Sequence, residues 1–249
     1  METLSLGGSR YFMTLVDDHS RYVFVYILKV KGLVKKYFAE FKVLVECQTG
    51  RKIKAIRSDN GTEICDSAVS QLLKQAGIVH QRSNNYTPQQ NSRVERAQRT
   101  LVEKARSLLA DANLGKEFWG KAVVTACYLM NRSPSRALNG KTPYEIWHGE
   151  QPDLSHLCVF GCPAWVHIPK EKRKKRDPKS ERLVFVGYPE GRKGYRLLDS
   201  VTRRAVNSRD VHFVEKPVAS APRTNHVPLA RNSDNIGFVE IPMISSPTY

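Results

Sequence analysis

The stretch YFMTLVDDHSRYVFVYIL, residues 11–28, decides the fold. Its apolar first half ends at Asp17 and Asp18, and its second half, from residue 22 onward, is rich in β-branched and aromatic side chains. Such side chains are typical of strands, and Asp and Ser side chains close local turns. We therefore predict a β-hairpin with Asp17 and Asp18 as turn residues.

The segments after the hairpin alternate between helical and strand patterns. Apolar positions recur at helical spacing from Gly32 to Glu46, and a third strand is expected to end at Arg57. Gly77 is predicted to be the C-cap of the next helix. The further predicted elements are helices over 63–76, 91–112 and 116–132 and a strand over 78–80. This α/β order predicts that residues 1–150 form one domain, a sheet covered by helices.

The residue pattern of the sequence changes after about residue 152. Short strand candidates at 158–168, 182–188, 195–199, 203–207 and 210–214 are separated by Gly, Pro and Asp turns, which predicts a small β-rich module over 153–216. A basic loop, Lys170–Arg176, lies between its first two strands. Residues 217–249 contain Pro, Ser and Asn with little periodicity and are predicted to be a disordered tail.

The chain is strongly basic, with a net charge of +16. Residues 1–150 carry 23 Lys and Arg against 14 Asp and Glu, and residues 151–249 carry 17 against 10, so the excess is not confined to a tail. A folded body this basic favours a polyanionic partner, most often nucleic acid, because neutralised phosphates release counterions. A place in a basic organelle or complex is the alternative.

Cysteine usage and hydropathy indicate an intracellular protein of the nucleus and cytoplasm. The five cysteines are odd in number and scattered, which argues against a disulfide framework and suits a reducing compartment. Cys158 and Cys162 have no second Cys/His pair at a zinc-finger distance, so core cysteines are favoured over a zinc site. No apolar stretch of about 18 residues and no signal-peptide core occur, so no membrane partner is expected.

Two carboxylates stand where a metal site could form. Asp59 follows the third strand, and the next two residues, Asn60 and Gly61, favour a tight turn, so Asp59 is either a turn residue or a metal ligand. Glu95 lies one turn into a long helix, where it either binds metal or pairs with Arg99 on a solvated face. Enzymes that transfer phosphoryl groups on nucleic acids commonly hold two divalent cations with a few carboxylates.

The chain resembles the integrases of Ty1/copia-type retrotransposons over residues 5 to about 215. The motifs that carry the resemblance occur in the family's order: YFMTLVDDHSRYVFVYILK, IRSDNGTE, YTPQQNSRVERAQRTL, FWGKAV, NRSPS, KTPYEIW, FGCPAWVHIP and DPKSERLVFVGYPEGRKGYRLLD. The resemblance implies a ribonuclease H-like mixed sheet and an Asp-Asp-Glu triad that binds Mg²⁺ or Mn²⁺. It also implies that DNA is the partner, as element ends and target DNA, and that the protein forms homo-oligomers.

The resemblance assigns roles residue by residue. Asp59 matches the second aspartate of the triad and Glu95 its glutamate, so both are expected to be catalytic metal ligands. Asn91 matches a mobile-loop position that contacts DNA, and Arg99 matches a basic DNA-contacting position. Further cations, two on the same helix and six in the basic loop, are expected to contact nucleic acid as well: Arg93, Arg96, Lys170, Lys172, Arg173, Lys174, Lys175 and Arg176. The loop that holds the last six is alternatively a nuclear-import signal or a solvated hairpin loop.

The first aspartate of the triad has no counterpart in this chain. In the family it lies on a strand that precedes the matched motifs, and the first strand of the sheet is therefore expected to be missing here. Because both metal sites would use that aspartate, metal affinity and strand transfer are expected to be reduced. The family also favours Gly and Val after the loop asparagine and Lys-Asn after Glu-Arg, where this chain has Ser92, Arg93, Ala97 and Gln98.

Three interpretations follow from these residues. The chain is the integrase catalytic fragment of a copia-type element, with DNA integration as its function and little activity as written. Alternatively, it is a non-catalytic nucleic-acid-binding remnant. A third interpretation is a product that does not fold stably, because a missing strand leaves backbone groups unpaired.

Overall fold

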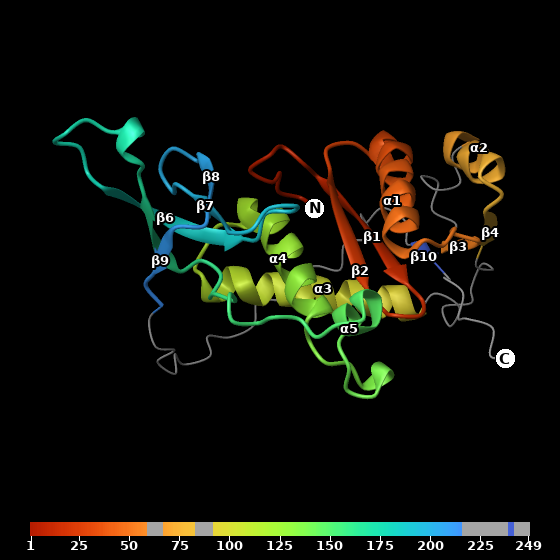
Figure 1. The fold of residues 1–249 in the computed structure, drawn as a ribbon. Coiled ribbons are helices and arrows are strands. Elements are labelled where there is room, and N and C mark those ends of the chain that lie inside the picture. Colours follow the sequence, from red (N-terminus) through yellow and green to blue (C-terminus); the bar gives the residue numbers. More distant parts are fainter. Residues whose placement is uncertain (59–66, 83–91, 216–238, 242–249) are drawn as a thin grey trace.

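In the part of the chain that the structure describes, strands form two five-stranded sheets. The computed structural model describes residues 1–58, 67–82, 92–215 and 239–241. Figure 1 shows the two sheets at opposite ends of the molecule, with helix α4 (Trp119–Asn131) between them. Within the described residues, every helix is too short or too polar to cross a membrane. The predicted α/β body with flanking helices and a separate β module is confirmed.

The predicted hairpin is the start of the first sheet. Strands β1 (Tyr11–Asp17) and β2 (Val23–Leu28) pair antiparallel, from Tyr11 opposite Leu28 to Val16 opposite Val23. The turn is closed by Asp17, whose Oδ2 accepts hydrogen bonds from the Ser20 backbone N at 2.7 Å and the Ser20 Oγ at 2.6 Å. The prediction that Asp17 is a turn residue is therefore confirmed.

Two helices cover one face of this sheet. Helix α1 (Val34–Thr49) begins after a 3₁₀ turn and ends at Gly50, whose left-handed φ of 65° lets its N–H reach the Glu46 carbonyl. Helix α2 (Ser67–Gln75) is followed by Gly77, the expected C-cap, with φ of 67°. Both helices pack on the same core cluster as the buried β1 residues Met13 and Leu15. This side of the sheet is therefore covered mainly by apolar side chains.

The opposite face is covered by α3 (Ser92–Asp111) and α4. Their buried side chains, among them Val94, Leu101 and Val123, pack on Phe12 and Val16 of β1. A short helix, α5 (Pro143–His148), follows and is started by a capping box between Thr142 and Glu145. The two predicted long helices are confirmed, although the second begins with a 3₁₀ turn at Lys116–Phe118.

The middle of the first sheet comes from the far end of the chain. Strands β3 (Ala55–Ser58) and β4 (Val79–Arg82) pair parallel, and β10 (Val239–Ile241) lies between β1 and β3. It is parallel to β1 at residues 15–17 and antiparallel to β3 at residues 57–58. The sheet order is β2-β1-β10-β3-β4.

Strand β10 corrects the prediction that 217–249 is a disordered tail, which is wrong at residues 239–241. The physical reason is that β1 and β3 both present backbone N–H and C=O groups to the gap between them, and such groups in a protein interior require partners. A segment of three residues is too short to show a period of two, so the sequence pattern holds no sign of it. The rest of the predicted tail, apart from these three residues, lies outside the described residues.

The second sheet is an antiparallel module in which neighbouring strands follow one another closely. Its strands are β5 (Pro163–His167), β6 (Ser180–Gly187), β7 (Tyr195–Leu198), β8 (Ala205–Ser208) and β9 (Val211–Phe213), in the order β8-β7-β6-β5-β9. All five predicted strands are present, but residues 158–162 are not part of the first one. The basic loop joins β5 to β6 as predicted.

Candidate metal and nucleic-acid site

Glu95 is carried by α3 beside the stripe that this helix buries. Val94 and Gln98 are buried, whereas Glu95 is half-buried and Arg99 is exposed. Successive helical residues are turned by about 100°, so Glu95 and Arg99 share one stripe of the surface. Both residues are described, and no ion pair of 4.0 Å or less joins them, so the predicted alternative of a Glu95–Arg99 pair is not formed.

The other predicted ligand follows a well-anchored strand. Ser58, the last residue of β3, is fully buried, and its Oγ lies 2.8 Å from the Nε2 of His80 on β4. Asp59 and Asn91 lie outside the described residues, so their expected roles stay predictions. Among the described side chains, no group of three or more His, Cys, Asp and Glu could hold a metal ion.

The donor set nevertheless fits the ions that the resemblance implies. Mg²⁺ and Mn²⁺ prefer carboxylate oxygens, and the predicted ligands, Asp59 and Glu95, are both carboxylates. The Glu95 carboxylate is within reach of solvent, and no cation in the described part of the chain lies within 4.0 Å of it as an ion pair. Glu95 is therefore positioned to accept a cation from solution.

The cysteines of the described chain do not form an alternative metal centre. Cys127 and Cys162 are buried, and burial raises the pKa of each thiol to about 12. Because the thiolate is the metal-binding form, such thiols are poor ligands. A hydrogen bond of 2.6 Å joins the nearby His156 to Tyr128. Of the two cysteines predicted to be core residues, Cys162 is buried and Cys158 is half-buried.

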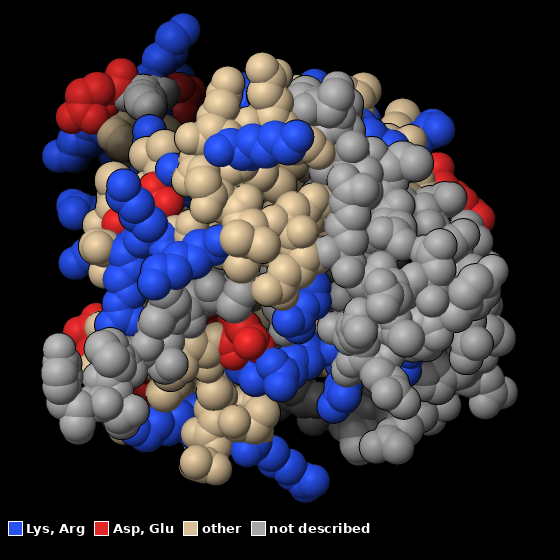
Figure 2. All heavy atoms as spheres, turned by 90° about the vertical axis from the view of Figure 1, so that its right-hand side faces the viewer, with Lys and Arg blue, Asp and Glu red and all other residues tan. Residues whose placement is uncertain are grey.

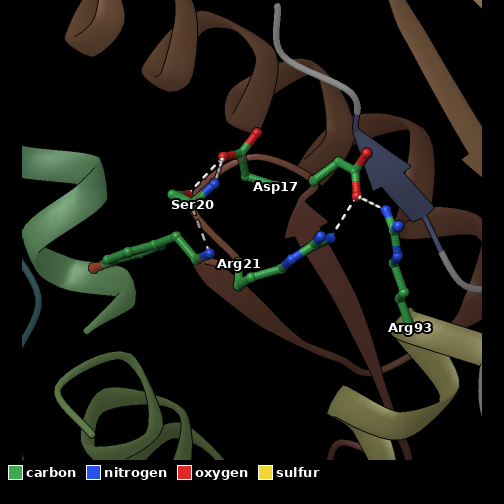
Figure 3. A network of polar contacts seen from close by, with 6 residues as sticks. Asp17, Ser20, Arg21 and Arg93 are labelled. Carbon is green, nitrogen blue, oxygen red and sulfur yellow. Dashed lines mark hydrogen bonds and ion pairs between the residues drawn. The ribbon is translucent and has the colours of Figure 1, made fainter. Parts of the chain in front are cut away.

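The predicted nucleic-acid contacts on α3 lie on two different sides of the helix. Arg99 shares the stripe of Glu95, whereas Arg93 and Arg96 are turned toward the β1–β2 turn and line a pocket there. Arg93 Nη1 donates to Asp18 Oδ1, which also accepts from Arg21 Nη1. Figure 3 shows the two guanidinium groups pointing toward one carboxylate. The structure therefore does not bring all the predicted α3 cations into one site.

The basic loop forms a separate group at the far end of the molecule. Figure 1 shows it beyond the second sheet, away from the first turn of α3. Four of its cations are exposed: Lys170, Lys174, Lys175 and Arg176. Arg173 is half-buried and its Nε donates to the Ile168 carbonyl at 3.3 Å, while the side chain of Lys172 is not described. The loop and Glu95 therefore cannot act as one local site.

Cations also dominate the face that carries α2 and β4. Figure 2 shows Lys and Arg side chains scattered over the described part of this face, with several groups of Asp and Glu between them. A surface on which positive charge is in excess attracts polyanions over a distance of about 10 Å in ordinary salt. This face agrees with the net charge of +16.

Sequence reasoning did not find the pocket beside α3. The helical spacing of Arg93, Arg96 and Lys104 was available as a signal, because residues three, four, seven or eight apart share a side of a helix. The pairing of Arg93 with Asp18 could not be found in this way, because it joins residues far apart in the chain.

Comparison with known proteins identifies the two parts of the chain. The integrase core domain family matches residues 3–88, and the retroviral polymerase SH3-like domain family matches residues 162–226. The second match covers the β module and extends past its last described strand. These two families account for most of the described chain.

Curated relatives are polyproteins of plant transposons. The retrovirus-related Pol polyprotein from transposon TNT 1-94 of Nicotiana tabacum is 46% identical over 246 residues, which are 99% of this chain and 18% of the relative. That from transposon RE2 of Arabidopsis thaliana is 36% identical over 213 residues, 86% of this chain and 14% of the relative. The chain thus spans less than a fifth of the length of these relatives.

A solved structure is also similar. The HTLV-2 integrase catalytic core domain in complex with magnesium, in a trimeric form, is 21% identical, with a TM-score of 0.41 over 53% of this chain and 81% of that one. Residues 3–88 of the chain match the integrase core domain family, and nearly the whole chain is similar to one segment of these plant-transposon Pol polyproteins.

Proposed function

We propose that this chain acts in DNA integration by metal-dependent strand transfer, with weak activity as written. The observation that carries the proposal is Glu95, a carboxylate left accessible on α3 beside the integrase core match. In this proposal Asp59 and Glu95 hold Mg²⁺ or Mn²⁺. A bound ion would activate the attacking hydroxyl and offset charge on the phosphate. Arg99, on the stripe of Glu95, would hold a phosphate of the DNA, and Asn91 would contact the DNA from its loop.

Reduced metal affinity is part of the proposal. In this proposal Asp59 and Glu95 are the only two carboxylate ligands, and two carboxylates hold a divalent ion less well than three. We propose element ends and target DNA as the partners, with the exposed basic loop as a second phosphate contact. Arg93 and Arg96 stay predicted DNA contacts that no observation tests.

Metal binding tests the site directly. Mn²⁺ titrated into the purified chain should be bound weakly, as followed by its electron paramagnetic resonance signal. Glu95→Gln keeps the size of the side chain and removes its charge, so it should lower Mn²⁺ binding further. Glu103→Gln, an exposed glutamate two turns along the same helix, is the matched control and should leave binding unchanged. Equal Mn²⁺ binding by the Glu95 variant and the unaltered chain would contradict the proposed site.

Strand transfer separates this function from its runner-up, a non-catalytic nucleic-acid-binding remnant. The net charge and the exposed basic loop support nucleic-acid binding, which is all that the remnant would do. Both proposals expect DNA binding that weakens steeply with salt. With element-end oligonucleotides and Mn²⁺, we expect traces of joined product that disappear in Asp59→Asn. Complete absence of product favours the remnant, and robust joining contradicts the impaired activity.

Assembly and location are further proposals. We propose that the chain forms homo-oligomers, which sedimentation of the purified protein would test. We also propose that it resides in the nucleus and cytoplasm, because its buried cysteines are free thiols and its basic loop is exposed. A fluorescent fusion whose nuclear signal persists after neutralising Lys174, Lys175 and Arg176 would show that this loop is not an import signal.

A further inference from the structure

A pocket of about 590 Å³ lies between α3, the β1–β2 turn and the loop that follows α4. Its apolar lining includes Val16 and Val23 from the two strands, Met130 from α4 and Pro143 from the start of α5. Val16, Val23 and Pro143 are buried, so the pocket has a fixed apolar floor that belongs to the body of the domain.

Four cations surround this floor: Arg21, Arg93, Arg96 and Lys104. Arg96 and Lys104 are exposed on α3. The guanidinium groups of Arg21 and Arg93 are held by Asp18, which orders them at the edge of the pocket (Figure 3). Among the described residues, four positive charges at this edge face the carboxylate of Asp18, and ordered guanidinium groups lose less freedom when they bind a ligand.

The pocket lies on a different side of α3 from the candidate metal ligand. Arg93, Thr100 and Lys104 follow one another at spacings of seven and four residues and line the pocket. Glu95 and Arg99 do not line it, and at about 100° per residue they lie on another stripe of the helix. An inference about the pocket is therefore independent of the proposed strand transfer.

A cationic edge around an apolar floor suits a ligand that is acidic and apolar at once. A nucleic-acid backbone would use the cations but would leave the half-buried apolar lining, Ala97 and Met130, in contact with water. An apolar side chain placed there would remove that surface from water, at about 25 cal/mol per Å². Carboxylates on either side of it would accept charge-assisted hydrogen bonds from the arginines.

We propose that this pocket binds a short acidic segment of a partner protein, with one apolar side chain on the floor and flanking Asp or Glu carboxylates at the cationic edge. Charge complementarity carries the choice of partner, because the pocket lies in a chain of net charge +16 that attracts acidic surfaces. The apolar side chain supplies specificity, since the same charge occurs over much of the surface.

Three fluorescent peptides test the proposal by anisotropy on the full chain. The first holds two leucines flanked by Asp and Glu, the second replaces the leucines with serine, and the third replaces the acids with Asn and Gln. We expect the first to bind and each of the others to bind at least about tenfold more weakly, because each lacks one of the two required features. Equal binding by the serine peptide would show attraction by charge alone and would overturn the proposal.

Two variants place the peptide in the pocket. Arg96→Glu combined with Lys104→Glu reverses the exposed part of the edge and should weaken binding by at least about tenfold. Thr100→Trp leaves the charge unchanged and fills the pocket from α3, so it should weaken binding comparably. The matched control is Lys35→Glu with Lys36→Glu, an equal charge change on α1 at the other face of the sheet, which should change binding by less than about threefold. Urea unfolding of each variant confirms that it is folded.

Duplex DNA, added as a competitor and measured with the same variants, shows whether the pocket binds an acidic peptide or nucleic acid. If Thr100→Trp leaves peptide binding unchanged, and the pocket charge reversal weakens DNA binding as much as peptide binding, the pocket is a nucleic-acid contact and the proposal is overturned. If Arg99→Glu weakens DNA binding alone and Thr100→Trp weakens peptide binding alone, the two sites are separate, as proposed. A failure of strand transfer leaves both outcomes unaffected.

Discussion

The two sheets are assembled in opposite ways. In the second sheet, the strands that pair all come from residues 163–213, and the bonded neighbours β5 to β8 follow one another in the chain. In the first sheet, residues 239–241 lie between the segments at 15–17 and 57–58. One sheet is completed by local connections, whereas the other depends on a segment from the opposite end of the sequence. The stability of the second sheet should therefore be far less sensitive to removal of residues 217–249.

Removal of residues 217–249 is expected to have the largest effect. Without β10, the first sheet becomes two separate pairs, β1 with β2 and β3 with β4. We expect the first sheet to lose its cooperative unfolding transition, a loss of at least about 5 kcal/mol, the stability of a small domain. Hydrogen exchange should show loss of protection at β1 and β3 amides and retained protection at β6 and β7.

A single substitution in β10 tests whether this strand holds the first sheet together. Proline at position 240, Glu240→Pro, removes a backbone N–H in the middle of β10 and should reproduce much of the effect of the truncation. The control is Ser233→Pro, six residues before the first residue of β10. Unchanged protection at β1 in Glu240→Pro would show that β10 does not hold the first sheet together.

The second sheet depends on Phe185. This side chain is fully buried on β6 and has the rings of Tyr188, Tyr195 and Phe213 within 6 Å of its centroid. Phe185→Ala should lower the free energy of unfolding by about 3–4 kcal/mol in a urea titration, because it leaves a cavity. Trp165→Ala on the same sheet removes a ring that is 42% exposed and should cost less than about 1.5 kcal/mol. Equal losses would contradict the assignment of the core.

The second sheet packs closely against α4 at Gly187, on β6. This residue has φ of 125°, and a Cβ built on it would lie 2.4 Å from Thr125 Oγ1 on α4. Gly187→Ala should cost about 1–3 kcal/mol in urea unfolding, from backbone strain and displacement of α4. Gly191→Ala is the control, because its φ of 66° is also left-handed but a Cβ there meets nothing within 4 Å. If Gly191→Ala lowers the free energy of unfolding as much as Gly187→Ala does, backbone strain alone explains the loss.

The smallest effect is a pH dependence at the edge of the first sheet. Burial, followed by the nearby Arg132, lowers the pKa of His148 on α5 below its ordinary value of 6.5. The unfolded chain therefore binds the proton more readily, and the contribution of His148 to stability is present above pH 6.5 and lost as pH falls below it. His148→Gln should flatten the urea stability profile between about pH 5 and 7. His212→Gln, on an exposed residue of the second sheet, should leave the profile unchanged.

The elements formed by local pattern could be predicted from the sequence. The hairpin, the helices and the strands of the β module all show their period within a few residues, and Asp17 closes its turn through a neighbour three positions away. The position of β10 could not be predicted, because it is decided by two edges more than a hundred residues upstream. The carboxylate of Glu95 was placed on α3 correctly, but the Asp18–Arg93 contact depends on how α3 packs against the hairpin.

The origin of β10 also has a consequence for synthesis. A ribosome makes β1 and β3 long before residue 239, so the edges of both strands stay open while the rest of the chain is translated. Open strand edges are templates for pairing with other chains, and contacts between distant residues form slowly. The newly made protein therefore passes through an interval in which it is most prone to aggregate and most in need of a chaperone, and this interval ends only when β10 emerges.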